Sequence, residues 1–289
     1  MASHQIWSCK DYQLDLSSHT LIMGILNVTP DSFSDGGQYN DPNKAIDHGL
    51  KLAEEGADII DVGGESTRPG AQPVSQDEEK SRTVPVIKEL ASQLDIPISI
   101  DTTKSDVARA AMDAGASIIN DISGFRFDPD IIEVARSTKA GVVIMHIQGE
   151  PRTMQSNPHY RDVVSDIKDY LAAQKQNLMQ SGIEKKCIVL DPGIGFGKSL
   201  QHNYDLIREL QQFLKLECPL LLGPSRKSFI GKVLNLSTDR RIEGTAAAVT
   251  ACILNGAHIV RVHDVKEMKR VVTIADTIIG KKPAKEWNA

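Results

Sequence analysis

Short apolar runs alternate with amphipathic stretches along most of the chain. Three segments, which begin at Gly56, Gly115 and Gly256, share the form Gly-Ala-x-Ile-apolar-polar, and each follows a helical pattern. A glycine directly after a helix is typical of a left-handed cap. The β-branched run that follows each glycine is typical of a buried parallel strand. The pattern therefore predicts repeated helix–turn–strand units.

Five further apolar runs fit the same alternation, and a helical stretch follows every predicted strand. Eight such units predict a (β/α)₈ TIM barrel, an α/β fold, with a doubly wound parallel sheet as the alternative. We expect residues 1–289 to form a single domain, in which residues 1–20 are an N-terminal extension or hairpin covering the barrel bottom. The predicted strands lie near 21–27, 58–63, 98–101, 117–122, 142–146, 188–191, 220–223 and 259–262, and the last helix near 265–279.

A polar residue stands at or just past the carboxyl end of most predicted strands. In a TIM barrel these ends form the rim that carries the active site. Asp61 and His146 could each be loop anchors, but a whole rim of such residues favours a functional site. The set consists of Asn27, Asp61, Asp101, Asn120, His146, Asp191, Arg261 and His263.

Two long loops, 28–42 and 64–77, follow predicted strands and are rich in turn residues. Long loops in a compact domain are usually either functional or disordered. Because both follow strands, we interpret them as mobile lids over the active face rather than inert insertions. Basic residues follow the last two predicted strands, in the segment from Ser225 to Ser228 and at Arg261 and His263. These positions frequently form a phosphate site in this fold.

The segment from Asp191 to Ser199 is similar to two nucleotide-binding motifs but matches neither. Pro192 stands where a P-loop needs its first glycine, and Lys198 where a dinucleotide fingerprint needs its third. We therefore expect the glycines to form a tight turn and Lys198 to be a solvated loop lysine.

Composition narrows the possible partners. The formal net charge is −5, which argues against general affinity for nucleic acid. The four cysteines are scattered and form no CxxC pair, which is typical of reduced core thiols. No apolar run predicts a signal core or a membrane span. We expect a cytoplasmic protein without membrane or nucleic-acid partners.

Eight motifs occur in a fixed order between about residues 20 and 280. The first two are Asn27-Val28-Thr29-Pro30-Asp31-Ser32-Phe33-Ser34-Asp35-Gly36-Gly37 and Gly63-Gly64-Glu65-Ser66-Thr67-Arg68-Pro69-Gly70. The others cover residues 99–102, 119–124, 145–146, 191–198, 225–228 and 261–264. In this combination the chain resembles the dihydropteroate synthase family.

The resemblance implies a magnesium-dependent transferase of folate biosynthesis. Such an enzyme joins p-aminobenzoate to 6-hydroxymethyl-7,8-dihydropterin diphosphate and releases pyrophosphate. Fixed cations would stabilise the departing diphosphate, and a carboxylate would stabilise positive charge on the pterin methylene. The amine of p-aminobenzoate is the nucleophile, so no covalent enzyme nucleophile is required. A homodimer and inhibition by sulfonamides are also implied.

The resemblance further implies a role for each motif residue. Asp101, Lys227 and Arg261 would be catalytic, and Asn27 would also bind Mg²⁺. The pterin diphosphate would contact Asn27, Thr67, Asp101, Asn120, Ile122, Met145, Asp191, Phe196, Lys227, Arg261 and His263. The p-aminobenzoate site and its loops would use Phe33, Ser34, Asp35, Arg68, Pro69 and Ser228, beside Lys227.

Three other functions remain open at this point. A pterin-binding methyltransferase on the same barrel would share Asn120 and Asp191 but would not need the cationic residues for a diphosphate. A non-catalytic pterin-binding homologue would bind without turnover. An aldolase could use Lys227 to form a Schiff base.

Overall fold

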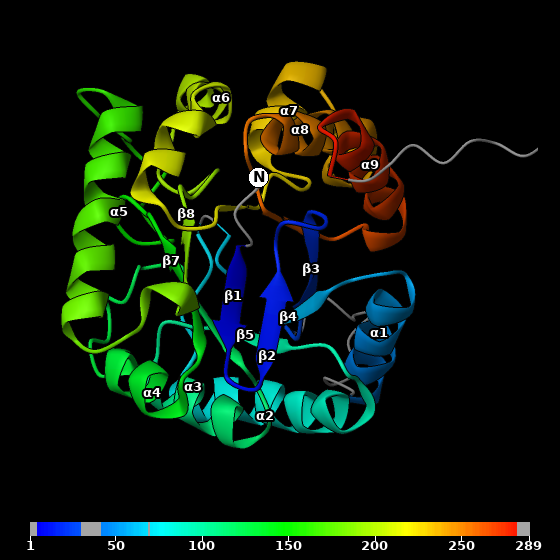
Figure 1. Cartoon of the computed structure of the whole chain (residues 1–289), viewed down its shortest axis with the longest axis vertical. Coiled ribbons are helices and arrows are strands. Elements are labelled where there is room, and N and C mark those ends of the chain that lie inside the picture. Colours follow the sequence, from blue (N-terminus) through cyan, green and yellow to red (C-terminus); the bar gives the residue numbers. More distant parts are fainter. Residues whose placement is uncertain (1–4, 30–41, 69, 282–289) are drawn as a thin grey trace, which may run out of the picture.

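The computed structural model describes residues 5–29, 42–68 and 70–281. Its first element is an antiparallel hairpin of β1 (Ile6–Cys9) and β2 (Tyr12–Asp15), which pairs Ile6 with Asp15. This confirms the hairpin predicted within residues 1–20. Figure 1 looks onto the hairpin, which lies in front of the strands and inside the ring of helices.

The other described strands form one parallel sheet that curves into a barrel. Their order is β8-β7-β6-β5-β4-β3-β10-β9, and a parallel bridge between Leu190 and Leu220 closes the ring. The TIM barrel is therefore confirmed over the doubly wound alternative. The strands are β3 (Leu21–Asn27), β4 (Ile59–Gly63), β5 (Ile98–Asp101), β6 (Ile118–Asp121), β7 (Gly141–Met145), β8 (Ile188–Asp191), β9 (Leu221–Leu222) and β10 (Ile259–Val262).

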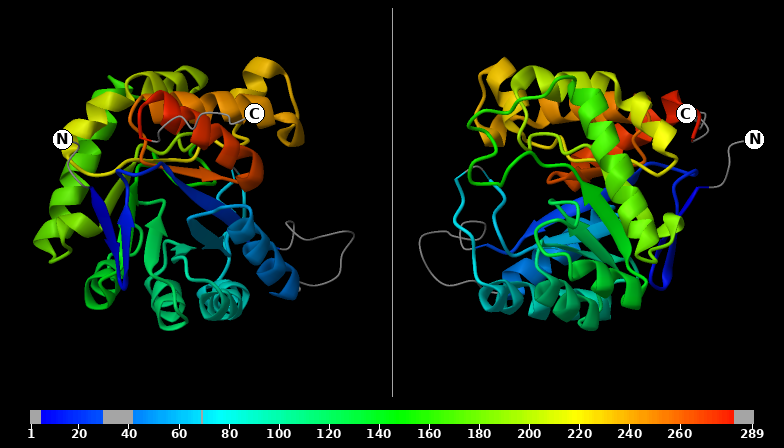
Figure 2. Two further views of the ribbon diagram at one scale, coloured as in Figure 1. Left: turned by 45° about the vertical axis from the view of Figure 1, so that its right-hand side comes forward. Right: turned by 90° about the vertical axis from the view of Figure 1, so that its left-hand side faces the viewer.

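Helices surround this barrel on the outside, as the side views in Figure 2 show. Gly56, Gly115 and Gly256 each have φ between 102° and 116°, which confirms the predicted turns after α1, α3 and α8. The helices are α1 (Pro42–Glu54), α2 (Gln76–Gln93), α3 (Ser105–Asp113), α4 (Ile131–Thr138), α5 (Val163–Gln180), α6 (Leu200–Arg208), α7 (Ser228–Leu234), α8 (Ile242–Leu254) and α9 (Val265–Ile278). Short 3₁₀ segments lie at η2 (Lys185–Cys187), η3 (Leu210–Leu216) and η4 (Thr238–Arg240).

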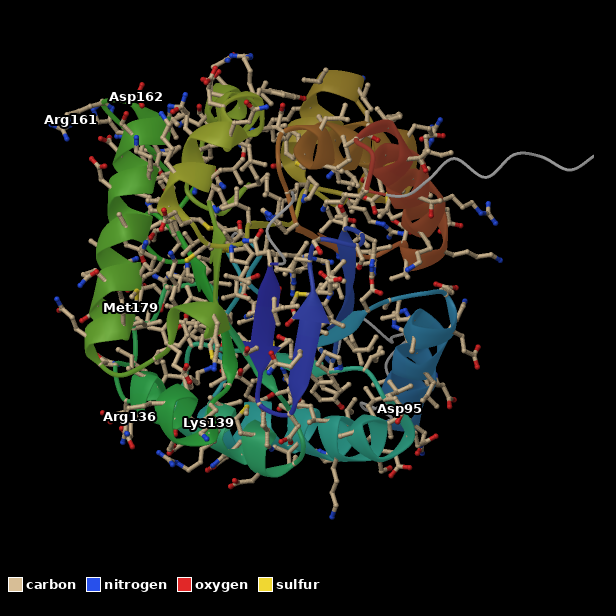
Figure 3. All side chains as sticks on the ribbon, in the orientation of Figure 1. Asp95, Arg136, Lys139, Arg161, Asp162 and Met179 are labelled. Atoms are coloured by element: carbon tan, nitrogen blue, oxygen red, sulfur yellow. The ribbon has the colours of Figure 1, made fainter. Side chains whose placement is uncertain are left out.

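Alternation along each strand sorts its side chains into two layers. In β10, Val260 and Val262 pack against the surrounding helices, while Ile259 joins the apolar cluster inside the barrel. Successive strand residues point to opposite faces, so Arg261 shares the inner side with Ile259. This confirms that Val262 faces the helices. Charged side chains such as Asp95, Arg136 and Arg161 project from the outer surface in Figure 3.

The hairpin seals the bottom of the barrel. Trp7, Cys9 and Leu16 are buried against the lowest inward residues of the strands, among them Met23 and Val143. The indole Nε1 of Trp7 donates to the carbonyl oxygen of Cys187 at 2.9 Å. The lower interior is therefore apolar and filled, and polar inward side chains are confined to the upper end.

We predict that Trp7→Ala lowers the free energy of unfolding by about 3 kcal/mol, because it removes a fully buried indole and leaves a cavity. Urea titration followed by circular dichroism measures the change. Ile6→Ala, on the exposed side of the same strand, is the matched control and should change stability by less than about 1 kcal/mol. Equal effects of the two substitutions would show that the hairpin does not plug the barrel.

Candidate active site

Arg261 lies at the centre of the polar upper layer. Its Nε donates to Asp61 Oδ2 at 2.6 Å, and a terminal guanidinium nitrogen donates to Asp101 Oδ2 at 2.7 Å. Asp61 is fully buried and Asp101 nearly so. Arg261 therefore forms ion pairs with two carboxylates on neighbouring parts of the barrel. These ion pairs fix the guanidinium at the mouth of the barrel.

The same carboxylate also holds the neighbouring amide. Asn120 Nδ2 donates to Asp61 Oδ2 at 3.1 Å, whereas Asp61 Oδ1 and Ser99 Oγ are buried without a described partner. Ser99 stands directly across from Asp61 in the register of β4 and β5. Asp61 is therefore an inner anchor for Arg261 and Asn120, which agrees with the anchoring role weighed for it from the sequence.

Asp101 faces the mouth above this anchor. Burial raises the pKa of Asp101 to about 7, while Arg261 acts in the opposite direction. A Cβ atom built on Gly63 would lie 3.8 Å from Asp101 Oδ2 and 3.9 Å from Asn27 Oδ1. The two oxygens therefore converge over the end of β4.

Asp191 and Lys227 form the opposite side of the mouth. Asp191 Oδ1 accepts the backbone N–H of Gly193 at 2.7 Å, and burial raises the pKa of the carboxyl group against the opposing effect of that hydrogen bond. Lys227 Nζ donates to the carbonyl of Ile194 and lies 4.3 Å from the ring centroid of Phe196. Burial lowers the pKa of Lys227 to about 7, and Asp191 opposes that shift.

An apolar cluster stands between these polar groups. Ile122, Met145 and Phe196, the three residues expected to form pterin walls, belong to one cluster with Ile147 and Met154. They come from the ends of β6, β7 and β8, so a flat apolar surface adjoins Asn120 and Asp191. This combination suits a planar heterocycle with a polar edge.

His263 is held in one orientation beside Arg261. Its backbone N–H donates to Ser225 Oγ at 3.2 Å, and the Ser225 hydroxyl lies 3.0 Å from His263 Nδ1. The Ser225 hydroxyl can donate to Nδ1 or accept from it, and a neutral imidazole carries one N–H donor in either case. Burial, assisted by Arg261, lowers the pKa of His263 to about 3. His263 is a neutral hydrogen-bond donor at physiological pH.

Arg226 does not face the mouth with Lys227. Its Nε donates to Asp264 Oδ2 at 2.9 Å, and a second nitrogen contacts Asp264 Oδ1. This pair ties the loop after β9 to the loop after β10. Arg226 has φ of 57°, a conformation that L residues seldom adopt.

A cleft of about 230 Å³ opens beside Asp101. At the side of this cleft, Lys104 donates to both Glu65 and Glu79. Lys104 follows β5, Glu65 follows β4 and Glu79 belongs to α2, so the lysine joins these three segments. Residues lining the cleft include Thr67, Asp101, Lys104, Ile122 and Phe127. Sequence reasoning missed Lys104 and Glu79, because neither ends a strand and the polar residues around each are typical of a solvated surface.

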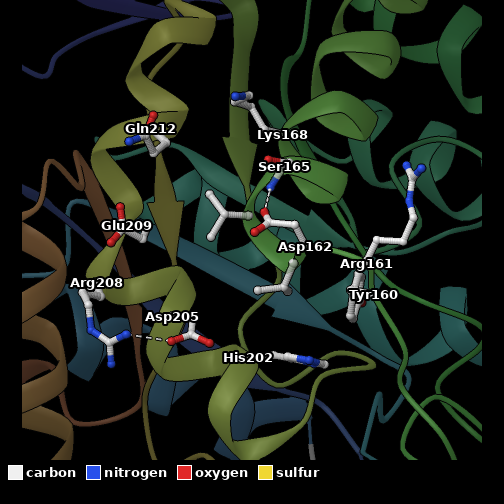
Figure 4. A pocket seen from close by; sticks show the side chains of 12 residues that line it. Tyr160, Arg161, Asp162, Ser165, Lys168, His202, Asp205, Arg208, Glu209 and Gln212 are labelled. Carbon is white, nitrogen blue, oxygen red and sulfur yellow. Dashed lines mark hydrogen bonds and ion pairs between the residues drawn. The ribbon is translucent and has the colours of Figure 1, made fainter.

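A larger groove, of about 590 Å³, lies outside the mouth along α5 and α6 (Figure 4). Its charged groups pair among themselves, for example Arg208 with Asp205 at 2.8 Å. No residue expected from the sequence lines it. The barrel mouth therefore remains the candidate site.

The prediction for Lys198 was wrong. This residue is 3% exposed, and its Nζ lies 2.8 Å from the carbonyl oxygen of Phe196 and 3.1 Å from His146 Nδ1. The tight turn itself is confirmed, because Gly193, Gly195 and Gly197 all have positive φ. His146 turns away from the mouth and packs edge-on against Tyr170, with ring centroids 4.8 Å apart, so it is a loop anchor.

Several expected p-aminobenzoate residues are not part of this geometry. Phe33, Ser34, Asp35 and Pro69 lie outside the described residues, together with most of the first predicted lid. Ser228 is exposed where α7 begins, and Arg68 is exposed after β4.

Comparison with known proteins agrees with this site. The family model described as pterin binding enzyme matches residues 23–263. The dihydropteroate synthase of Synechocystis sp. is 48% identical over 265 residues, which covers 91% of this chain and 92% of that protein. Two solved structures of the same kind superpose closely. That of Yersinia pestis dihydropteroate synthase, in complex with a sulfonamide drug, has a TM-score of 0.90 and 43% identity and covers 95% of this chain and 99% of its own. That of Xanthomonas albilineans dihydropteroate synthase, with 4-aminobenzoic acid, has a TM-score of 0.90 and 40% identity and covers 96% and 99%.

The fold and site thus define a pterin-binding TIM barrel. The chain belongs to the dihydropteroate synthase family of pterin binding enzymes. This confirms the resemblance drawn from the sequence over the methyltransferase, non-catalytic and aldolase alternatives.

We predict that Arg261→Ala lowers the free energy of unfolding by about 3 kcal/mol, because it leaves the buried Asp61 carboxylate unpaired. Adding Asp61→Asn should restore about 1 to 2 kcal/mol, because a neutral amide needs no cation. A double-mutant cycle in urea measures the coupling. Strictly additive losses would mean that the two side chains do not stabilise each other.

Proposed function

We propose that the chain condenses p-aminobenzoate with 6-hydroxymethyl-7,8-dihydropterin diphosphate to give 7,8-dihydropteroate and pyrophosphate. It is a transferase of folate biosynthesis. The observation that carries the assignment is the guanidinium of Arg261, fixed by two carboxylates next to an apolar slot with a polar edge.

The pterin fits the slot by its shape and its hydrogen-bonding edge. Ile122, Met145 and Phe196 would contact the faces of the ring system. Asn120 and Asp191 would read its aminopyrimidinone edge, where an amide can donate and accept and a carboxylate can accept two N–H groups. Asn120 is already oriented by Asp61, which leaves less side-chain entropy to lose on binding.

Bond cleavage separates charge between two ends of the site. Negative charge grows on the departing diphosphate, where Arg261 offers a fork of donors and His263 a neutral imidazole. Positive charge grows on the pterin methylene, which the Asp101 carboxylate stabilises. Lys227 would complete the cationic side. Thr67 and Asn27 would contact the diphosphate from the neighbouring strand ends.

The p-aminobenzoate amine attacks the methylene carbon from the open side of the mouth. We assign Arg68, Ser228 and Lys227 to this side. Phe33, Ser34, Asp35 and Pro69 lie outside the described residues, and we propose that they also contribute to p-aminobenzoate binding. Solved structures of the Xanthomonas and Yersinia enzymes contain 4-aminobenzoic acid and a sulfonamide drug, respectively, which supports binding of both kinds of ligand by this chain.

Magnesium fits this arrangement as a partner of the diphosphate. Mg²⁺ usually takes one or two protein oxygens and completes its shell with phosphates and water. Asn27 Oδ1 is such an oxygen, and it converges with Asp101 Oδ2 over Gly63. Among the described residues no group of three or more acidic, His or Cys side chains could hold a metal by itself. When bound, the ion would neutralise charge on the leaving group.

We also propose a cytoplasmic homodimer. On the outer surface of α9, Ile274 and Ile278 lie one helical turn apart and are 63% and 65% exposed. A second copy of the chain would cover such an apolar pair. The four cysteines are free and buried, as in a reducing compartment. None of the described helices is of a length and apolarity that would span a bilayer.

The reaction is tested by pyrophosphate release. We predict release only when pterin diphosphate, p-aminobenzoate and Mg²⁺ are all present, because the amine is the nucleophile and the ion assists departure. Chelation of the metal should abolish release and added Mg²⁺ should restore it. Release without p-aminobenzoate would instead indicate a hydrolase, and pterin binding without any turnover would indicate a binding homologue.

We predict that Asp101→Asn keeps the fold but lowers kcat by at least about a hundredfold, because charge stabilisation in the transition state is lost. Wild-type kcat/KM should rise with pH as Asp101 ionises and fall as Lys227 loses its proton, giving a narrow maximum near pH 7.

The acid limb should disappear in Asp101→Asn, while the alkaline limb remains. Asp77→Asn, on the exposed first turn of α2, is the matched control and should leave the profile unchanged. Wild-type turnover by folded Asp101→Asn would remove Asp101 from the mechanism.

A further inference from the structure

Lys198 is a buried cation directly behind the proposed pterin pocket. Its Nζ lies 2.8 Å from the Phe196 carbonyl oxygen, 3.1 Å from His146 Nδ1 and 3.3 Å from the His146 carbonyl oxygen. An ammonium group has three N–H donors, one for each of these acceptors. Burial lowers the pKa of His146 to about 2, and Lys198 adds to this effect, so the ring is neutral and its Nδ1 can accept.

The loop around Lys198 is pressed against the end of β7. A Cβ atom on Gly193 would lie 1.9 Å from the His146 carbonyl oxygen and 3.3 Å from Lys198 Nζ. A Cβ atom on Gly197 would lie 2.6 Å from the Gln148 carbonyl oxygen. The contact is therefore between two backbones, and Lys198 joins them. The Tyr160 hydroxyl also holds this loop, because it donates to the Gly197 carbonyl oxygen at 2.7 Å.

This loop carries two groups of the pterin pocket. Asp191 begins the loop and accepts the Gly193 N–H. Phe196 lies further along the loop, with Lys227 Nζ above its ring. Without Lys198 the loop would be free to shift. Asp191 would then move away from the pterin edge, and Phe196 from the pterin face, that each is proposed to contact. The anchor at Lys198 is thus positioned to govern pterin recognition without touching the pterin.

A buried ammonium is costly unless its charge is balanced. Burial lowers the pKa of Lys198 well below its usual value and Lys227 adds to this shift, whereas Asp191 opposes it and favours the charged ammonium form. The charged and titratable groups that face Asp191 are Lys198 on its own loop, Lys227 after β9, Arg261 on β10 and the Cys252 thiol on α8. Lys198 is therefore one of three cations around the Asp191 carboxylate.

We propose that Lys198 is a positioning residue for pterin recognition: its ammonium fixes the loop of residues 191–199 to the end of β7 and keeps Asp191 an ionised, correctly aimed acceptor. The inference rests on the proposed role of Asp191 at the pterin edge. It predicts an effect on pterin affinity and on its pH dependence, with p-aminobenzoate affinity unchanged.

The test is calorimetric titration of a dihydropterin lacking phosphate against wild type, Lys198→Met and Lys198→Gln between pH 5 and 9. Asp191 accepts N–H groups only when ionised, so affinity falls as pH falls through its pKa. Loss of the Lys198 charge raises that pKa further, so in both variants the fall in affinity should occur at higher pH than in wild type, and binding should be weakest at the acid end of the range.

The two variants separate charge from hydrogen bonding. Lys198→Gln retains N–H donors without charge, so it should hold the loop better than Lys198→Met while showing the same pH shift. It also keeps the test decisive if Lys198→Met does not fold. Lys175→Met is the matched control. Lys175 on α5 also donates to a backbone carbonyl, that of Leu216 at 2.9 Å, and its removal should change neither the pterin affinity nor the pH profile.

Three outcomes would overturn the proposal. The first is that a folded variant binds the dihydropterin with wild-type affinity and pH dependence. The second is that the loss of dihydropterin affinity has the same size at every pH. The third is that p-aminobenzoate affinity falls by the same factor. Failure of the wild type to bind the dihydropterin at all would refute the proposed function itself, and this result is distinct because it appears without any substitution.

Discussion

The mouth of the barrel depends on the mutual neutralisation of buried charges. Asp61, Asp101 and Asp191 face Arg261, Lys227 and Lys198 in a space from which most water is excluded. Each charge alone would be costly there, and each becomes tolerable because an opposite charge lies close by. Arg261 is the key member, because its planar fork links β10 to both β4 and β5.

The architecture supplies the setting for this cluster. The lower interior of the barrel is filled by apolar residues and closed by Trp7 of the hairpin. The inward positions one step higher along β4, β5 and β10 carry Asp61, Ser99 and Arg261. The anchored charges therefore rest on a rigid apolar floor, and the groups proposed to meet substrate project above them. A site on strand ends is held more rigidly than one on loops.

The strands and their polar ends could be predicted because both follow local rules. Gly-Ala-x-Ile repeats mark helix ends and strand starts, and the carboxyl ends of parallel strands must meet at one rim. The register pairs Asp101 with Asn120 at the upper end and Asp61 with Ser99 lower in the barrel. The shortness of β9 was less evident, because Gly223 and Pro224 end a run that looks longer in sequence.

Pairings between distant segments could not be predicted in the same way. Lys198 follows a glycine-rich turn, so its local pattern is that of an exposed lysine. Two of its three acceptors come from His146, 52 residues earlier. Arg226 shares a basic motif with Lys227 but pairs with Asp264, because a positive φ turns its side chain away. In both cases the residue that accepts the hydrogen bond follows a different strand: His146 follows β7 and Asp264 follows β10. Neither pairing can be read from the local sequence around the cation.

The central claim is that Arg261, held by Asp61 and Asp101, is the main cation for the diphosphate. Calorimetric titration of pyrophosphate, pterin diphosphate and a dihydropterin lacking phosphate tests it most directly. The two proteins to compare are Asp61→Asn and the double variant Asp61→Asn/Arg261→Ala. In the Asp61→Asn background the removal of Arg261 leaves no unpaired carboxylate at position 61, so the barrel is not destabilised by a buried charge. The account predicts that removing Arg261 weakens the two phosphate-bearing ligands at least about tenfold and leaves the dihydropterin nearly unchanged. Equal losses for all three ligands would contradict it and would make Arg261 a structural element of the barrel alone.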